Sequence, residues 1–335
     1  MANDIDIFSL QPSVLDKSLR GKYILLYGKP KCGKTSFAVQ APRALVCAFE
    51  LGVNALAGTK YVPILRWSDF KKVMAQLKKP QAKEMYDTIV LDTVSIAYEL
   101  CEKFILQRES VSSIKDIPFG AGYGMVSGEF QECLREITML GFGLILICHS
   151  KEVATNNYDE DGNPIMMIQP SLSKRPMEIC NAICDVIGAI NTEFENGKAV
   201  RYLYTRQTPT IFAGSRYKYL KEKIPFGYNE LTEAISEAIE KSVELDGAQV
   251  VEKGEQVQIK DRPFQEVMNE AKEIWTSYLE NVSNEEEREV HYRQMKDIIK
   301  RVFGHEDFKL SQAVMSQVDL VEIFIAEMKT LIENS

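Results

Sequence analysis

Residues Lys22–Val39 read KYILLYGKPKCGKTSFAV, and this stretch decides the fold that we expect for the chain. Its first part, Tyr23–Tyr27, is a run of aliphatic and aromatic residues typical of a buried β-strand. The next eight residues, Gly28–Thr35, follow the pattern G-x-x-x-x-G-K-T, and Ser36–Val39 favours a helix. A strand, this glycine loop and a helix in that order indicate a phosphate-binding P-loop.

The spacing inside this loop follows from the chemistry of holding a triphosphate. Gly28 and Gly33 let the backbone curl so that successive N–H groups point at a phosphate, and the helix that follows adds the positive end of its dipole. Lys34 is expected to reach the β- and γ-phosphates, and the Thr35 hydroxyl to ligate Mg²⁺. We therefore expect ATP and Mg²⁺ as cofactors. The residues expected to hold the nucleotide are Gly28, Lys29, Pro30, Lys31, Cys32, Gly33, Lys34, Thr35 and Ser36.

Composition narrows the class of protein. The chain has 335 residues, of which 45% are apolar, enough for one large α/β domain and a smaller one. A net charge of −8 argues against a surface covered in basic residues but leaves room for a local basic groove. Seven cysteines without a C-x-x-C pair are expected to be reduced, and only three histidines accompany them, so zinc is not expected.

The chain shows no sign of export or membrane insertion. Its first residues lack the charged and apolar regions of a signal peptide, and no apolar run approaches the ~20 residues of a membrane span. We therefore expect a cytoplasmic protein that does not enter a membrane.

Apolar runs of strand length alternate with helical stretches after the P-loop. The strand-like runs are Ala44–Glu50, Thr88–Thr93 and Gly141–Cys148, and the helical stretches are Trp67–Leu77, Ile96–Gln107 and Phe130–Leu140. This alternation predicts a parallel sheet built from βαβ units, and ligands of such sheets lie at the carboxyl ends of the strands. Glu50, Asp92 and His149 all lie at such ends. Asp92 closes an apolar strand in the Walker B manner, so we expect it to bind the magnesium ion together with Thr35.

Two stretches lack regular periodicity. Residues 109–128 are rich in Ser and Gly, and residues 153–176 carry a turn-rich tip at 159–163, so both are expected to be long loops. Loops of this length in a compact domain are usually functional or disordered. Beyond them, 183–190 and 201–205 are expected to form strands joined by an Asn196-Gly197 hairpin, and Asn229–Lys241 a helix capped by Asn229.

The domain organisation expected from these features is a core at 1–243, a polar linker at 244–262 and a helical module at 263–335. Apolar residues recur three and four positions apart in three segments of the last part, which predicts a small helical bundle. This module is rich in acidic residues. It could be a helical cap or oligomerisation element, or a docking site for a partner protein.

The order of the P-loop, Glu50, the Asp92 strand and the His149 strand resembles the RecA-like ATPase core. More narrowly, it resembles the phage-encoded ATPases of the Sak-type recombination family, over roughly residues 15–240. The fold that the resemblance implies is an α/β RecA-like P-loop NTPase core, with a mainly parallel twisted sheet flanked by helices. The C-terminal α-helical module lies outside it.

The resemblance also implies roles for individual residues. Glu50 matches the acid that activates the attacking water, and His149 the polar residue that senses the γ-phosphate, where RecA itself has an amide. Arg216 matches the basic residue that reaches the γ-phosphate of a neighbouring subunit, with Lys34 completing the catalytic set. The alternatives are an ordinary surface glutamate, a hydrogen-bonded histidine and a structural arginine.

The same resemblance places two DNA-binding loops at 109–124 and 153–176. The side chains expected to contact a single strand by charge and stacking are Lys115, Tyr123, Lys151, Lys174 and Arg175. Acidic residues at 159–161 argue against contact at that tip.

The function that follows is a magnesium-dependent ATPase that binds single-stranded DNA. It would act in phage-type recombination or replication, in the host cytoplasm, as a homo-oligomeric ring or filament, with a partner protein at residues 263–335. Two alternatives stay open: a hexameric motor of the helicase or loader kind, and a nucleotide-gated interaction protein.

Overall fold

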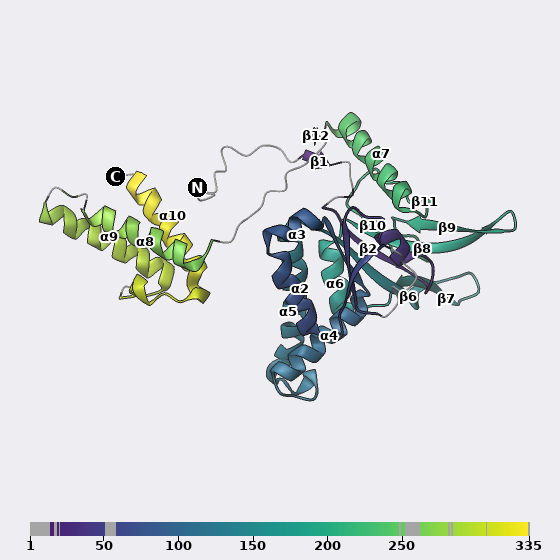
Figure 1. Cartoon of the computed structure of the whole chain (residues 1–335), viewed down its shortest axis with the longest axis horizontal. Helices are drawn as coiled ribbons and strands as arrows, with labels where there is room; N and C mark the ends of the chain where they lie inside the picture. The colour runs from purple at the N-terminus through teal and green to yellow at the C-terminus, as the bar shows by residue number, and fades with distance from the viewer. Residues whose placement is uncertain are drawn as a thin grey trace. The chain divides into compact units, whose positions relative to one another are not determined.

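The computed structural model describes residues 14–16, 19, 21–50, 58–247, 249–251, 262–280, 282, 284–305 and 307–333. The chain divides into two compact units, residues 1–258 and residues 259–335 (Figure 1). Two hydrophobic clusters lie in the first unit and a separate one in the second, so each unit has its own core.

The first unit is built on a mostly parallel sheet. Its strands are β2 (Tyr23–Gly28), β3 (Ala44–Ala48), β4 (Lys60–Pro63), β5 (Thr88–Asp92), β6 (Gly143–Tyr158), β7 (Pro164–Pro170), β8 (Val186–Glu195), β9 (Lys198–Tyr204), β10 (Gly214–Ser215) and β11 (Lys223–Pro225). Their order is β11-β9-β8-β2-β6-β5-β3-β4, with β10 on β8 and β7 on β6. All neighbours from β8 to β4 are parallel, and β7, β9, β10 and β11 pair antiparallel. The expected α/β architecture is confirmed.

Helices cover both faces of this sheet. They are α1 (Lys34–Ala38), α2 (Trp67–Leu77), α3 (Pro80–Met85), α4 (Val94–Arg108), α5 (Ala121–Met139), α6 (Lys174–Ile183) and α7 (Tyr228–Asp246). Leu25 and Tyr27 face the core formed with α2, α4, α5 and α6, whereas Ile24 and Leu26 face the core formed with α1 and α7. Because both faces of β2 are buried, its sequence is a continuous apolar run. Figure 1 shows the two helical layers.

The stretch 109–128 is not one long loop. Two 3₁₀ turns, Ile114–Asp116 and Pro118–Gly120, lead directly into α5, which begins at Ala121. Glycine has low helix propensity, so the glycines of this stretch led the sequence analysis to predict a loop instead of the first turns of α5. Gly122 allows close packing, because a Cβ there would lie 2.8 Å from the Ile114 carbonyl oxygen.

The stretch 153–176 is not a loop either. Strand β6 continues to Tyr158 and pairs antiparallel with β7, so most of the stretch is a β-hairpin. Its tip is ordered by Asp159, whose Oδ1 accepts hydrogen bonds from the backbone N–H groups of Asp161 and Asn163. Much of the hairpin is exposed. A strand without one consistently buried face gives no apolar alternation, which is why the sequence did not predict it.

The last part of the core differs from expectation in detail. The β8–β9 hairpin is confirmed, with its turn at Asn196 and Gly197, both at positive φ. The sequence also predicts that Arg206, Arg216 and Lys218 lie in strands, and this is wrong, because all three lie outside the strands that the structure describes. Helix α7 begins one residue earlier than expected and has Gly227 at its N-cap, where no side chain caps it.

The expected linker at 244–262 starts inside ordered structure. Helix α7 continues to Asp246, and β12 (Gln249–Val251) pairs in parallel with β1 (Val14–Asp16). Residues 252–261 lie outside the described part of the chain.

The second unit consists of α8 (Phe264–Glu280), α9 (Glu285–Phe303) and α10 (Val318–Glu333), with 3₁₀ turns at Leu310–Gln312 and Met315–Gln317. These helices coincide with the three amphipathic segments of the sequence. Across all the residues that the structure describes, no helix combines the length and apolarity needed to span a membrane.

Candidate functional site

The loop between β2 and α1 has the backbone of a phosphate cradle. Gly33 forms the N-cap of α1 with φ 101°, a left-handed conformation that side-chain-bearing residues rarely adopt. A Cβ on Gly33 would also lie 3.0 Å from Arg201 Nη1 and 3.2 Å from Phe226 Cε1. At Gly28 a Cβ would lie 2.9 Å from Cys32 Sγ. A side chain would therefore be strained at Gly33 and crowded at Gly28.

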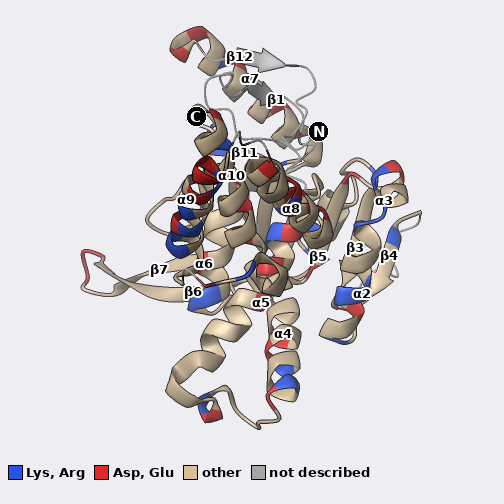
Figure 2. Cartoon of the chain, turned by 90° about the vertical axis from the view of Figure 1, so that its left-hand side faces the viewer, with Lys and Arg blue, Asp and Glu red and all other residues tan. Residues whose placement is uncertain are grey.

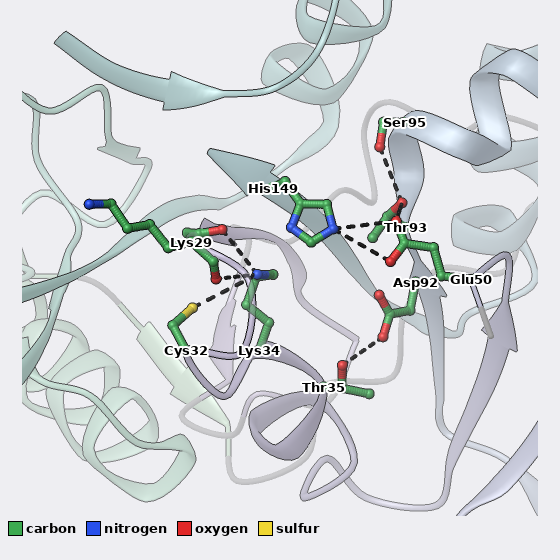
Figure 3. A network of polar contacts seen from close by, with 10 residues as sticks. Lys29, Cys32, Lys34, Thr35, Glu50, Asp92, Thr93, Ser95 and His149 are labelled. Atoms are coloured by element: carbon green, nitrogen blue, oxygen red, sulfur yellow. Dashed lines mark hydrogen bonds and ion pairs between the residues drawn. The ribbon is translucent and has the colours of Figure 1, made fainter. Parts of the chain in front are cut away.

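Lys34 lies buried at the centre of this cradle. Its Nζ donates hydrogen bonds to the carbonyl oxygens of Gly28 at 3.0 Å and Lys29 at 2.8 Å (Figure 3). The side chain of Lys29 points away from this cluster. The ammonium group is thus held inside the loop by neutral carbonyls, a position from which it can bind phosphate oxygens.

The two residues expected to bind magnesium are in direct contact. Thr35 Oγ1 donates a hydrogen bond to Asp92 Oδ2 at 2.7 Å. Burial raises the pKa of the Asp92 carboxyl above its usual range, while the hydrogen bond from Thr35 acts in the opposite direction. A hydroxyl and a carboxylate are the hard oxygen ligands that Mg²⁺ prefers, and a divalent cation would offset the desolvation of the ionised carboxylate. This pair therefore fits a magnesium ion.

Glu50 and His149 come together beside this pair. Glu50 follows β3, and His149 lies in β6. These two strands lie on either side of β5 in the sheet. Glu50 Oε2 lies 3.4 Å from His149 Nε2, and its Oε1 accepts a hydrogen bond of 2.9 Å from Thr93 Oγ1. The other ring nitrogen, His149 Nδ1, is buried and has no hydrogen-bond partner within the described part of the chain.

Five of the sequence-predicted residues thus form one constellation at the carboxyl edge of the parallel strands (Figure 3). They are Lys34, Thr35, Glu50, Asp92 and His149. The arrangement combines a cation for phosphate oxygens, a magnesium pair and a carboxylate able to accept a proton from water, which suits hydrolysis of a nucleoside triphosphate.

Sequence reasoning missed Arg201 on β9. Its Nη1 donates a 2.8 Å hydrogen bond to the Cys32 carbonyl oxygen of the P-loop, and its guanidinium lies 5.7 Å from the centre of the Phe226 ring. This contact depends on the pairing of β8 with β9, which places Arg201 beyond the end of β2. No sequence pattern predicts it.

Thr93 and Ser95 were also missed. Thr93 directly follows Asp92 and contacts Glu50, while Ser95 Oγ lies 3.1 Å from Thr93 Oγ1. The sequence feature that could have identified Thr93 is a hydroxyl residue directly after the Walker B aspartate.

Arg216 is not brought to this site within its own chain. Its Nη1 lies 3.2 Å from Asp185 Oδ1, and its Nη2 donates to the Ala182 carbonyl oxygen. The adjacent Ser215 pairs with Val186 at the start of β8, whereas the P-loop follows the opposite end of β2. A catalytic role for Arg216 would need the site of a neighbouring copy, and it stays a prediction.

The residues expected to contact DNA divide into two groups. Tyr123 and Arg175 meet, with the guanidinium carbon 4.3 Å from the centre of the ring, and Lys115 and Lys174 are exposed. Lys151 is half-buried instead, and its Nζ donates a 2.7 Å hydrogen bond to the Leu172 carbonyl oxygen. Lys151 therefore has a structural contact in the hairpin.

An exposed aromatic residue accompanies the first group. Phe119 is fully exposed, at 105% relative accessibility, and has φ 58°. It precedes α5, the helix that carries Tyr123. Figure 2 shows a different character at the β6–β7 tip, where Asp159, Glu160 and Asp161 make the end of the hairpin acidic.

Comparisons with known proteins place this site in context. Residues 20–217 match a family described as an AAA domain, a span that includes the P-loop, Glu50, Asp92 and His149. The chain is 31% identical over 338 aligned residues to a Bacillus subtilis (strain 168) protein, described as SPbeta prophage-derived uncharacterized protein YorG. The alignment covers 98% of this chain and 99% of that protein.

Among solved structures, the chain is similar to the flagellar accessory protein FlaH from Methanocaldococcus jannaschii. The TM-score is 0.35 and the sequence identity 13%, over 62% of this chain and 85% of that one.

Proposed function

This chain belongs to the AAA domain family of P-loop ATPases, and we propose that it hydrolyses ATP with Mg²⁺ and that single-stranded DNA stimulates this hydrolysis. The observation that carries the hydrolytic part is the constellation of Lys34, Thr35, Asp92 and Glu50 at one edge of the sheet. A protein that only binds nucleotide does not need a carboxylate held in place beside the P-loop.

The proposed chemistry assigns each side chain a step. Lys34 binds the phosphate oxygens, and Glu50 orients a water molecule for in-line attack on the γ-phosphorus and accepts its proton. Thr35 and Asp92 would hold a Mg²⁺ ion, which would stabilise the negative charge that develops on the phosphates. His149, with an unpartnered buried Nδ1 and its Nε2 near Glu50, responds to the presence of the γ-phosphate.

A continuous set of contacts supports communication between this site and the proposed DNA surface. The His149 carbonyl oxygen accepts a 2.7 Å hydrogen bond from the backbone N–H of Ser171. Three residues later α6 begins, and its Arg175 stacks on Tyr123 of α5. A shift of His149 would therefore be transmitted through backbone to the Tyr123–Arg175 pair.

The surface proposed to bind DNA consists of Lys115, Phe119, Tyr123, Lys174 and Arg175. Aromatic rings offer stacking platforms for bases, and the cations attract the phosphate backbone without sequence preference. The net charge of −8 does not argue against DNA binding at this surface. Residues 263–335 contain 15 Asp and Glu against eight Lys and Arg, whereas residues 1–262 are nearly balanced at 33 against 32.

The biological setting proposed is phage-type recombination or replication. Its support is the prophage-derived relative that aligns over nearly the whole chain. In a ring or filament, Arg216 could reach the γ-phosphate of a neighbouring copy, because about half of its side chain is exposed despite the Asp185 contact.

The deciding experiment is steady-state ATP hydrolysis by the full chain, with and without single-stranded DNA, at low and moderate salt. We expect stimulation that weakens as salt rises, because phosphate contacts release counterions. Lys34→Ala is expected to abolish turnover. Tyr123→Ala is expected to keep the DNA-independent rate and lose stimulation, and Gln131→Ala serves as an exposed control on the same helix, α5.

Absence of stimulation at any salt concentration would overturn the DNA-dependent part. Turnover that persists in purified Lys34→Ala at the rate of the unaltered chain would overturn the assignment of ATP hydrolysis to this site.

A second candidate, a nucleotide-gated interaction protein, is favoured by one observation. The C-terminal unit has its own core and carries most of the net negative charge. Tight ATP binding with negligible turnover, with or without DNA, would favour this candidate.

A further inference from the structure

Thr93 joins two parts of the site that the sequence presents as separate. It follows Asp92 at the end of β5 and is the N-cap of α4, with extended backbone at φ −110° and ψ 153°. Threonine is favoured at N-caps because its hydroxyl accepts a hydrogen bond from a backbone N–H of the first turn. Here the side chain makes no capping bond. The hydroxyl is turned toward Glu50 instead.

The direction of the hydrogen bonds follows from the chemistry of the partners. A carboxylate only accepts, so the single hydroxyl proton of Thr93 is donated to Glu50 Oε1, at 2.9 Å. Thr93 Oγ1 also lies 3.1 Å from Ser95 Oγ. Since the Thr93 proton is already used, Ser95 must be the donor in this second contact. The result is a directed chain from Ser95 to Thr93 to Glu50 (Figure 3).

Glu50 is anchored at its backbone as well. The Asp92 carbonyl oxygen accepts hydrogen bonds from the N–H groups of Phe49 at 2.7 Å and Glu50 at 3.1 Å. Thr93 is only 1% exposed, so water does not readily compete for its hydroxyl. One carboxylate oxygen of Glu50, Oε1, is therefore held by a buried donor, and both carboxylate oxygens lie 3.4 Å from His149 Nε2.

We propose that Thr93 is a positioning residue that orients the Glu50 carboxylate for catalysis, and that Ser95 orients the Thr93 hydroxyl. The inference rests on the proposed function, in which Glu50 activates the attacking water. Because Thr93 donates its hydroxyl proton to Oε1, Oε2 is the oxygen without a hydroxyl donor and the one that would accept the proton of the attacking water. Small displacements of a general base reduce the rate strongly while leaving substrate binding intact.

The first test compares Thr93→Val, which removes the hydroxyl at similar size, with Thr93→Ser, which keeps it. In the full chain we expect Thr93→Val to lower kcat for ATP by about tenfold to a hundredfold. KM and the affinity for a non-hydrolysable ATP analogue should stay within about twofold, because the hydrogen bonds of Thr93 within the described part of the chain go to Glu50, Ser95 and Ala97 and not to the P-loop. Thr93→Ser should keep most of the activity, and Ser95→Ala should show a smaller loss than Thr93→Val.

A loss of nucleotide affinity together with kcat in Thr93→Val, without rescue by Thr93→Ser, would indicate a general structural role and overturn the inference. Unchanged kcat in both Thr93→Val and Ser95→Ala would overturn it as well.

A double-mutant cycle with Glu50→Gln separates this inference from the proposal on which it rests. If Thr93 acts through Glu50, Thr93→Val has no further effect on kcat in the Glu50→Gln background. If Thr93→Val lowers kcat by the same factor in the Glu50→Gln background as in the unaltered chain, the inference is contradicted. Full activity of Glu50→Gln alone would overturn the proposed role of Glu50, whereas an inactive Glu50→Gln beside a fully active Thr93→Val would overturn only the positioning role.

Discussion

Asp92 is a single residue of the site whose buried charge lowers the stability of the folded chain. Burial raises the pKa of its carboxyl, so the ionised form is disfavoured in the folded chain, and the Thr35 hydrogen bond offsets only part of this effect. An acid with a raised folded-state pKa stabilises the fold while it is protonated, and loses that contribution as the pH rises through the folded-state pKa. At neutral pH the negative charge is thus retained for function at the expense of stability.

We therefore expect Asp92→Asn to stabilise the nucleotide-free protein at neutral and alkaline pH. Asparagine resembles the protonated acid in shape and keeps an oxygen that can accept from Thr35. The midpoint of thermal unfolding should rise by about 1–3 °C near pH 8 and by less near pH 4, because the fraction of Asp92 that is protonated increases as the pH falls. Differential scanning fluorimetry at both pH values measures this.

Hydrolysis should be lost in the same variant, since the magnesium pair would lack its charge. A difference in the midpoint that is the same at both pH values would show that burial of the Asp92 charge is not its cause.

At the scale of elements, the β6–β7 hairpin is anchored at its base and exposed at its tip. Near the base, the Lys151 ammonium donates to the Leu172 carbonyl oxygen, and the Tyr27 hydroxyl donates to the Phe212 carbonyl oxygen and lies 3.0 Å from that of Ile168. Beyond Ala154 the strands contribute nothing to the buried core. The element therefore couples to the site through its base, while its acidic tip is dispensable for folding.

Replacing residues 155–165 by Asn-Gly tests this division. The change joins the paired residues Ala154 and Met166 by a two-residue turn and removes Asp159, Glu160 and Asp161. We expect the unfolding midpoint to change by less than about 2 °C, because no core residue is lost. Affinity for single-stranded DNA, measured by fluorescence anisotropy at low salt, should stay equal or increase, because three negative charges are removed.

The unaltered chain at the same salt concentration is the control. A marked loss of DNA affinity in the shortened variant would place the DNA contact on the hairpin tip and contradict the surface proposed around Tyr123.

At the scale of the whole molecule, the chain is two units with separate cores and different charge. The helical unit buries its own apolar residues, including Val267, Met295, Val321 and Phe324, all without exposed surface. Arg262 adds ion pairs that link α8 and α10 through Glu270 and Glu322. The second unit therefore buries its apolar core residues with its own helices.

We therefore expect residues 1–258 and 259–335 to fold as separate fragments. The second should give a helical circular dichroism spectrum and a cooperative thermal transition, because its core is complete. The first should bind an ATP analogue with an affinity within about threefold of the full chain, since every residue of the P-loop site lies within it.

The spectrum of the full chain should equal the sum of the two fragments. A fragment that unfolds without a cooperative transition would show that the units depend on each other.

The sequence by itself determined the phosphate-binding loop and the constellation around it. Continuous apolar runs reveal strands that are buried on both faces, and the carboxyl ends of parallel strands share one edge of a sheet. Glu50, Asp92 and His149 could therefore be brought beside Lys34 and Thr35 without coordinates. The α8, α9 and α10 helices were equally readable, because each shows its core face as a three-and-four spacing.

Only the tertiary structure decided which side chains hold these residues in place. The contacts of Thr93 with Glu50, Arg201 with Cys32 and Tyr123 with Arg175 join residues from different elements, and each depends on strand register or helix placement to within an ångström or so. The β6–β7 hairpin was hidden for a related reason. Its exposed strands are stabilised by backbone pairing, which leaves no periodic apolar pattern in the sequence.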